Sequence, residues 1–201
     1  ARDVETLNRT AEELTANGAT LLAVPTDVTD EAQVETLFAR AMERFNRLDI
    51  LFNNAGAFDG GPIDELSTAA WDKVIAVNLR GPFLCTRAAM RIMKKQGGGR
   101  IINIGSISAQ RVRPTSAPYS TSKFGIWGLT QVTALEGRQY GIAASCLHPG
   151  NTLVERVSNR PEPPAEPMMA VDELAQAAVL MATLPPHVNM LEAIVMPVEQ
   201  L

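Results

Sequence analysis

A tyrosine and a lysine stand four residues apart in the segment PYSTSKFGIWGLT, which covers residues 118–130. If this segment is helical, Tyr119 and Lys123 lie on one face, a single turn apart. A free tyrosine has a pKa of about 10, too high for efficient proton transfer at neutral pH. A nearby ammonium stabilises the phenolate and lowers this pKa. The pair therefore favours a general acid/base, and a half-buried helix tyrosine beside an unrelated lysine is the alternative.

Further polar residues follow apolar segments of strand-like composition. Ser106 lies thirteen residues before Tyr119, and its hydroxyl can hold a substrate oxygen whose charge changes. Ser108 is an alternative candidate for holding the substrate oxygen. In the non-catalytic alternative, Ser106 is an ordinary turn serine. The segment FNNAG, residues 52–56, fixes a turn or brings backbone close to a flat ligand. Asn78 is a polar residue in an apolar helical pattern, and if it is buried it needs hydrogen-bond partners. A helix-face asparagine bonded to a neighbouring turn is the alternative.

These candidate residues can act together only if the helices and strands place them at one edge of a sheet. Apolar segments alternate with one-sided helical patterns along the whole chain. The expected strands lie within residues 19–28, 48–56, 97–106, 141–151 and 190–198, and the expected helices cover 2–18, a segment that begins after an N-cap at Asp30, 68–95, 117–138 and 171–184. Strands that are apolar on both faces predict an α/β fold with a doubly wound, Rossmann-type parallel sheet. In such sheets ligands bind beyond the carboxyl ends of the strands.

Composition restricts the class of protein. The 201 residues carry a net charge of −4, which argues against nucleic-acid binding. No apolar run is long enough for a membrane span and no signal peptide is evident, so we expect a cytoplasmic protein with no membrane partner. Cys85 and Cys146 stand in apolar segments as buried thiols. His148 and His187 lack neighbours at ligand spacing, so no metal is expected.

The ordered set of motifs resembles the short-chain dehydrogenase/reductase family over nearly the entire chain. The matching residues are TDVTD (26–30), NNAG (53–56), Asn78, IINIGS (101–106), the Tyr119/Lys123 pair and HPG (148–150). The resemblance implies hydride transfer between NAD(P)(H) and a small carbonyl/alcohol substrate. It also implies that residues 1–201 form one nucleotide-binding domain, in which the proline-rich segment 153–169 is a substrate loop.

The resemblance assigns a part to each matching residue. Tyr119 would be the general acid/base, Lys123 would lower its pKa and bind the nicotinamide ribose, Ser106 would polarise the carbonyl, and Asn78 would hold a water in the proton relay. The remaining cofactor contacts would come from Asp27 and Val28 at the adenine, from Asn54, Ala55 and Gly56 along the cleft, and from Pro149 and Gly150 at the nicotinamide. Thr152 would replace a threonine that the family often has two positions later, where Val154 stands here.

The sequence departs from the family at its start. The family begins with a strand, a turn of the form T-G-x-x-x-G-x-G and a helix, none of which is present. In the family, the two strands of this N-terminal β-α-β unit lie between the strands that correspond to residues 19–28 and 48–56. Their loss would split the sheet, so we expect that the unit is missing and that the chain is a fragment. Arg2 stands where the family recognises the ribose and can meet a 2′-phosphate. This favours NADP, with NAD as the alternative cofactor.

Two other functions fit parts of the pattern. A catalytically silent relative would keep the fold as a binding or regulatory module, and a flavodoxin-like binding domain would give Tyr119 no part in chemistry. The long helices 68–95 and 117–138 can form a subunit interface, as they do in the family. We therefore expect a homodimer or a homotetramer.

Overall fold

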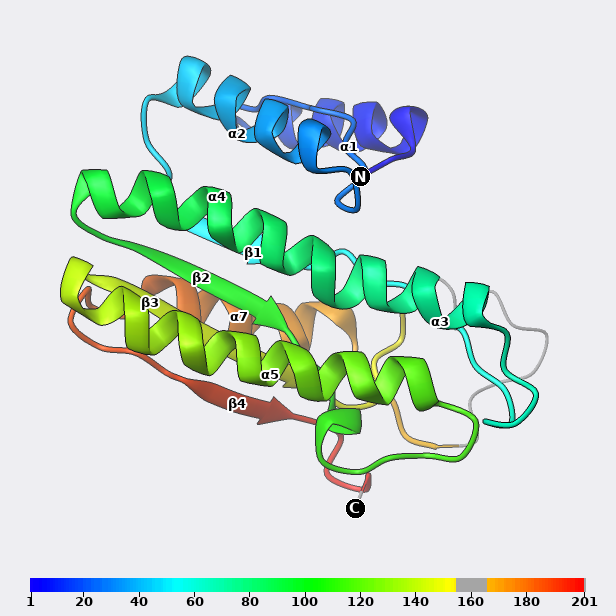
Figure 1. Cartoon of the computed structure of the whole chain (residues 1–201). Helices are drawn as coiled ribbons and strands as arrows, with labels where there is room; N and C mark the ends of the chain where they lie inside the picture. The colour runs from blue at the N-terminus through cyan, green and yellow to red at the C-terminus, as the bar shows by residue number, and fades with distance from the viewer. Residues whose placement is uncertain (155–165, 201) are drawn as a thin grey trace.

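A four-stranded parallel sheet lies between helices on its two faces (Figure 1). The fold is seen in a computed structural model, which describes residues 1–154 and 166–200. The strands are β1 (Ile50–Asn53), β2 (Gly99–Ile104), β3 (Ile142–Pro149) and β4 (Glu192–Val195), in the spatial order β1-β2-β3-β4. Every neighbouring pair is parallel, which confirms the α/β class and the parallel sheet.

Consecutive residues of β2 point into two separate cores because side chains alternate along a strand. Ile101 belongs to the core beneath α4 (Gly81–Gln96), while Ile102 packs with Met181 of α7 (Val171–Thr183) on the opposite face. Helix α5 (Ala117–Gly137) lies beside α4, and α7 lies behind the sheet in Figure 1. The two central strands, β2 and β3, are thus covered on both faces, as their apolar composition predicts.

The helix predicted over residues 68–95 forms, with an irregular turn in its middle. It consists of α3 (Thr68–Ile75), the π-helical turn η1 (Ala76–Arg80) and α4. A π turn adds one residue to the helical repeat and commonly occurs at functional sites. Here the turn contains Asn78, whose environment is described below.

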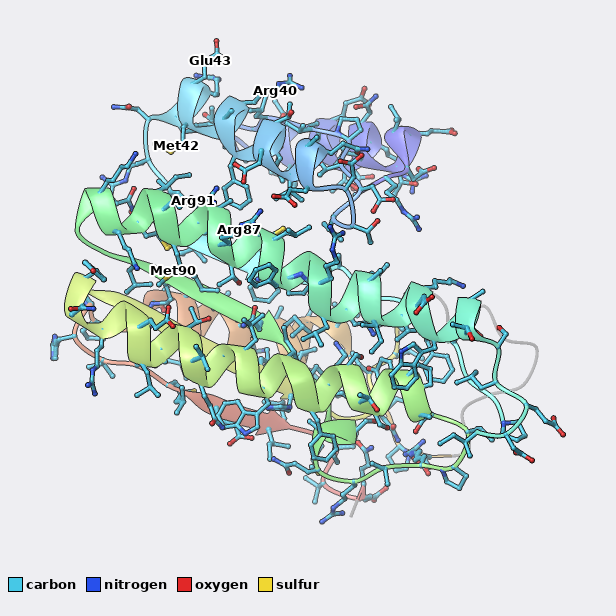
Figure 2. All side chains as sticks on the ribbon, viewed as in Figure 1. Arg40, Met42, Glu43, Arg87, Met90 and Arg91 are labelled. Carbon is cyan, nitrogen blue, oxygen red and sulfur yellow. The ribbon has the colours of Figure 1, made fainter. Side chains whose placement is uncertain are left out.

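Two helices precede the sheet. Helix α1 (Val4–Ala16) has no buried residue, whereas Val34 and Phe38 of α2 (Glu31–Phe45) pack into the core beside α4. The predicted N-cap is present at the start of α2, where the Asp30 carboxylate accepts N–H groups of the first turn. Arg87 and Arg91 of α4 extend towards α2 (Figure 2), where they pair with Glu31 and Glu35.

The strand predicted within residues 19–28 is wrong. No residue of this segment belongs to a sheet ladder in the described structure. An extended segment becomes a strand only by pairing with a neighbour, and no described strand lies beside this one. Correspondingly, β1 is an edge strand whose Ile50 and Phe52 are exposed. The missing unit that would pair with both stays a prediction.

The predicted loop 153–169 lies partly outside the description, since residues 155–165 are not described. Its two ends are joined: the Leu153 N–H donates to Met169 O over 2.9 Å, and Met169 N–H donates to Asn151 O over 3.0 Å. Leu153 is exposed at this junction, whereas Met169 is buried.

Two expectations from composition concern the described residues. Cys85 and Cys146 are buried free thiols, as predicted, and burial raises their pKa values to about 11 and about 12. No helix within residues 1–154 and 166–200 is long and apolar enough to cross a bilayer.

Candidate active site

Tyr119 and Lys123 lie in the first two turns of α5, at the carboxyl end of the sheet. The Lys123 Nζ atom lies 5.5 Å from the centroid of the Tyr119 ring. It donates a hydrogen bond of 2.8 Å to the carbonyl oxygen of Ile104, the last residue of β2. One lysine therefore joins the tyrosine-bearing helix to the strand that leads into Ser106.

The Lys123 side chain is almost completely buried, with 5% of the residue exposed. Burial disfavours the charged form and lowers its pKa from 10.5 to about 8. The group is thus mainly charged at neutral pH. An ammonium has three donors, and Ile104 is the acceptor that the described residues supply. The remaining donors can serve a bound ligand.

Ser106 follows β2 and is buried. Its Oγ accepts the N–H of Ser108 over 3.1 Å, which starts the short turn η2 (Ile107–Ala109). A hydroxyl has one donor and two acceptor positions, so this bond leaves the Ser106 hydrogen to donate. Ser108 contributes only its backbone N–H to this contact, and its own hydroxyl stays the alternative to that of Ser106.

The Asn78 side chain has hydrogen-bond partners at both its oxygen and its nitrogen, and the residue is only 1% exposed. Its Oδ1 accepts the N–H of Ala57 over 2.7 Å, and its Nδ2 donates to Ala57 O over 2.9 Å and to Ser122 Oγ over 3.1 Å. Ser122 in turn donates to the carbonyl of Tyr119 over 2.6 Å. The amide thus ties η1 to the turn after β1 and to the first turns of α5.

The NNAG segment divides into a buried and an exposed part. The buried Asn53 amide donates to Asn103 Oδ1 over 2.8 Å and to Thr86 Oγ1 over 3.2 Å, so it joins β1 to β2 and α4. Asn54, Ala55 and Gly56 are exposed beyond the carboxyl end of β1. Asn53 is therefore structural, while the three following residues are accessible to a ligand.

Arg2, Asp27 and Val28 form a separate group near the start of α4. The Arg2 guanidinium lies 3.6 Å from the Asp27 carboxylate. Hydrogen bonds from Thr29, with Arg2 as a smaller cause, hold the pKa of Asp27 below its usual value. A Cβ on Gly81 would lie 2.8 Å from a methyl carbon of Val28, so this glycine permits the close approach.

The segment after β3 packs against the C-terminal residues. Gly150 donates its N–H to Val195 O over 2.7 Å, and a Cβ here would lie 2.3 Å from Gln200 Oε1. The Thr152 hydroxyl donates to Gly150 O over 3.2 Å. Pro149, Gly150 and Thr152 are all partly exposed. This turn borders the same sheet edge as Ser106.

Three neighbours of the site carry no motif in the sequence. The ring of Phe58 lies 5.3 Å from that of Tyr119, Ser122 connects Asn78 to Tyr119, and Gln200 accepts the N–H of Asn151 over 2.7 Å. Ser122 lies between Tyr119 and Lys123 in the sequence, and this position is the one sequence signal that indicates its place in the site. Among the described residues, no group of three His, Cys, Asp or Glu side chains is placed to hold a metal ion.

Comparisons with known proteins identify the family of the chain. A sequence profile of the family described as "short chain dehydrogenase" matches residues 1–164. The chain is 37% identical to levodione reductase of Leifsonia aquatica over 166 residues, which are 81% of this chain and 62% of that protein. It is 35% identical to 3-oxoacyl-[acyl-carrier-protein] reductase of Synechocystis over 164 residues, 82% of this chain and 65% of that protein.

A solved structure extends the likeness to the fold. Gluconate 5-dehydrogenase of Burkholderia cenocepacia, in complex with NADP and tartrate, superposes with a TM-score of 0.85 at 30% identity. The superposition covers 98% of this chain and 82% of that structure. The chain thus spans less than two thirds of the two curated relatives and most of this solved chain. The profile match and the relatives show that the chain belongs to the short-chain dehydrogenase/reductase family of oxidoreductases.

Proposed function

We propose that the protein transfers a hydride between NAD(P)(H) and a carbonyl/alcohol substrate, with Tyr119 as the general acid/base. The observation that carries the proposal is the buried Lys123 ammonium, which lies beside the Tyr119 ring and is bonded to the end of β2. A surface lysine would not be placed between the proton donor and the strand that presents Ser106. The names of two relatives, a levodione reductase and a gluconate 5-dehydrogenase, support the same class of reaction.

The described residues fit a nicotinamide cofactor at two places. Lys123 has donors left for ribose hydroxyls, and the exposed Asn54–Gly56 segment lies at the same sheet edge. The Arg2–Asp27 pair offers a guanidinium that is largely in solvent, which suits a 2′-phosphate. NADP is therefore the proposed cofactor and NAD the alternative. When bound, the cofactor supplies or accepts the hydride.

The side chains would then manage the proton and the reacting oxygen. In reduction, the Tyr119 hydroxyl gives its proton to the oxygen of the substrate carbonyl, and the Lys123 ammonium stabilises the phenolate that remains. Ser106 donates its hydroxyl hydrogen to the same oxygen. Both Nδ2 hydrogens of Asn78 are used by Ala57 and Ser122, so a relay water would donate to the second acceptor position of Asn78 Oδ1 or bind the backbone of η1.

The surroundings suggest the kind of substrate and the assembly. Leu153 and Val154 are exposed at the base of the loop, which favours a substrate with an apolar part.

Three apolar residues of α5, Phe124, Val132 and Leu135, are also exposed. They share one face of α5 with Gly128, around whose Cβ position there is open space. A homodimer or homotetramer that covers this face of α5 is proposed, and light scattering of the purified protein measures it.

The experiment that tests the function is a carbonyl screen on the full-length protein. NADPH oxidation is followed with ketones, diketones, oxo acids and acyl-chain carbonyls, and wild-type protein is compared with Ser106→Ala. We expect turnover of at least one class, lowered about 100-fold or more in the variant. A protein that binds NADPH and turns over none of them would instead be a silent module.

A further inference from the structure

His148 is the one fully buried histidine among the described residues, with 0% of its surface exposed, and the proposed reaction gives it no part. It is the penultimate residue of β3, directly before the Pro149–Gly150 turn. Its ring contacts the backbone of Ser106, the second residue after β2. His148 thus lies between the nicotinamide-bordering turn and the serine that would hold the substrate oxygen.

One nitrogen of the ring lies against both backbone polar groups of Ser106. Nδ1 is 3.2 Å from the Ser106 N and 3.0 Å from the Ser106 O. A single nitrogen accepts from the N–H when it is unprotonated or donates to the carbonyl when it is protonated. The protonation of Nδ1 therefore decides which of the two Ser106 groups His148 binds.

The other nitrogen faces a carboxylate. Nε2 is completely buried and has no well-aligned hydrogen bond in the described structure, but Glu192 Oε1 lies 3.4 Å away. Glu192 comes from β4, and its Oε1 also accepts from Gln110 Nε2 over 3.0 Å. A carboxylate attracts an N–H and repels a nitrogen lone pair. Glu192 therefore favours the tautomer with its hydrogen on Nε2, which leaves Nδ1 to accept the Ser106 N–H.

Packing holds the ring in this orientation. Trp127 of α5 meets it edge-on, with ring centroids 5.9 Å apart. A Cβ at position 105 would lie 2.5 Å from Nδ1, so a residue other than Gly105 would displace the ring. The ring is thus enclosed by groups from the segment after β2, from α5 and from β4.

We propose that His148 is a positioning residue that holds the Ser106 hydroxyl in place for the reacting oxygen, with Glu192 fixing the required ring tautomer. The part played in turnover rests on the proposed function, since it acts through Ser106. The contact with the Ser106 backbone does not depend on it. The two can therefore be tested separately.

The first test is a cycle of variants in the full-length protein. His148→Leu should lower kcat about 10- to 100-fold, because displacement of a reacting group by about 1 Å has an effect of this size. In a Ser106→Ala background the same substitution should change kcat less than about twofold. An equal loss in both backgrounds would mean that His148 supports the fold and not Ser106, and would overturn the proposal.

Two further variants control for damage to the core. Asn carries a polar atom as many bonds from Cβ as Nδ1 is, so His148→Asn should recover most of the turnover that His148→Leu loses. Ser145→Ala removes another buried bond of β3, the one to Asn189, and should leave kcat within about twofold of wild type. Failure of His148→Asn to exceed His148→Leu, with both folded, would count against the proposal.

The second test needs no turnover. Nitrogen chemical shifts of the His148 ring should show the hydrogen on Nε2, and hydrogen exchange at the Ser106 amide should be slow in wild type and in Ser145→Ala but fast in His148→Leu. If wild-type protein reduces no carbonyl, the proposed function fails while this measurement still decides the contact. A hydrogen on Nδ1 alone, or exchange at Ser106 that is insensitive to His148→Leu, would overturn the inference.

Discussion

The Lys123 ammonium nitrogen lies 2.8 Å from the carbonyl oxygen of Ile104, in a contact that joins α5 to the end of β2. Ile104 is two residues before Ser106, and Lys123 is one turn after Tyr119. The bond therefore fixes the relative position of the two groups that would share the substrate oxygen. The Lys123 side chain is also buried, which lowers its pKa to about 8.

This pKa predicts a pH dependence of cofactor binding. Below pH of about 8 the Lys123 side chain is charged and can donate to ribose hydroxyls, and above it the charge is lost. The Kd for NADPH should therefore rise as pH increases through about 8. Fluorescence titration of Trp71 and Trp127 measures it, and an affinity that is constant from about pH 6.5 to 9.5 would contradict the assignment.

The same pKa predicts the sign of a stability change. Between about pH 8 and 10.5 the unfolded chain binds a proton at Lys123 and the folded chain does not, so the free energy of unfolding should rise with pH in this window. Lys123→Met removes the group and should remove this contribution to the rise. Urea unfolding at a series of pH values measures the difference, and equal slopes for both proteins would show that burial does not lower the pKa.

Arg2 should discriminate between the two cofactors. Its guanidinium is largely in solvent beside Asp27, and we propose that it meets the 2′-phosphate, which NADH lacks. Arg2→Ala should weaken NADPH binding about 10-fold and leave NADH binding nearly unchanged. Arg9→Ala, at an exposed position of α1, is the matched control. If Arg2→Ala affects both cofactors equally, Arg2 does not read the phosphate.

Asn78 should matter to stability beyond any part in the reaction. Asn78→Leu deletes three hydrogen bonds of a buried side chain and leaves the N–H and the carbonyl of Ala57 without these partners. The free energy of unfolding should fall by about 2–4 kcal/mol. The same substitution at the exposed Asn8 of α1 should change it by less than about 0.5 kcal/mol. A similar small effect at both positions would mean that the Asn78 bonds do not form.

The sequence predicts the sheet well where the strands are buried on both faces. The β2 and β3 segments are mainly apolar and begin after glycines, and they form the centre of the sheet. The segment 19–28 has the same local composition, but strand formation depends on a partner. The composition of a segment does not show whether a neighbouring strand is there to pair with it, so this strand prediction fails.

The site was predictable to the extent that it follows strand ends and helical spacing. Tyr119 and Lys123 share a face because a helix repeats every 3.6 residues, and Ser106 follows from the end of β2. The contacts of Asn78 with Ala57 and of Lys123 with Ile104 depend on how η1 and α5 pack. Glu192 reaches His148 from β4, 44 residues farther along the chain, and no local pattern contains that information.

The most direct test of the central claim is Tyr119→Phe in the full-length protein. The variant keeps the ring that contacts Phe58 and loses only the hydroxyl. We expect kcat for carbonyl reduction to fall about 100-fold or more, while the Kd for NADPH stays within about twofold of wild type. Unchanged turnover in Tyr119→Phe would contradict the assignment of Tyr119 as the general acid/base.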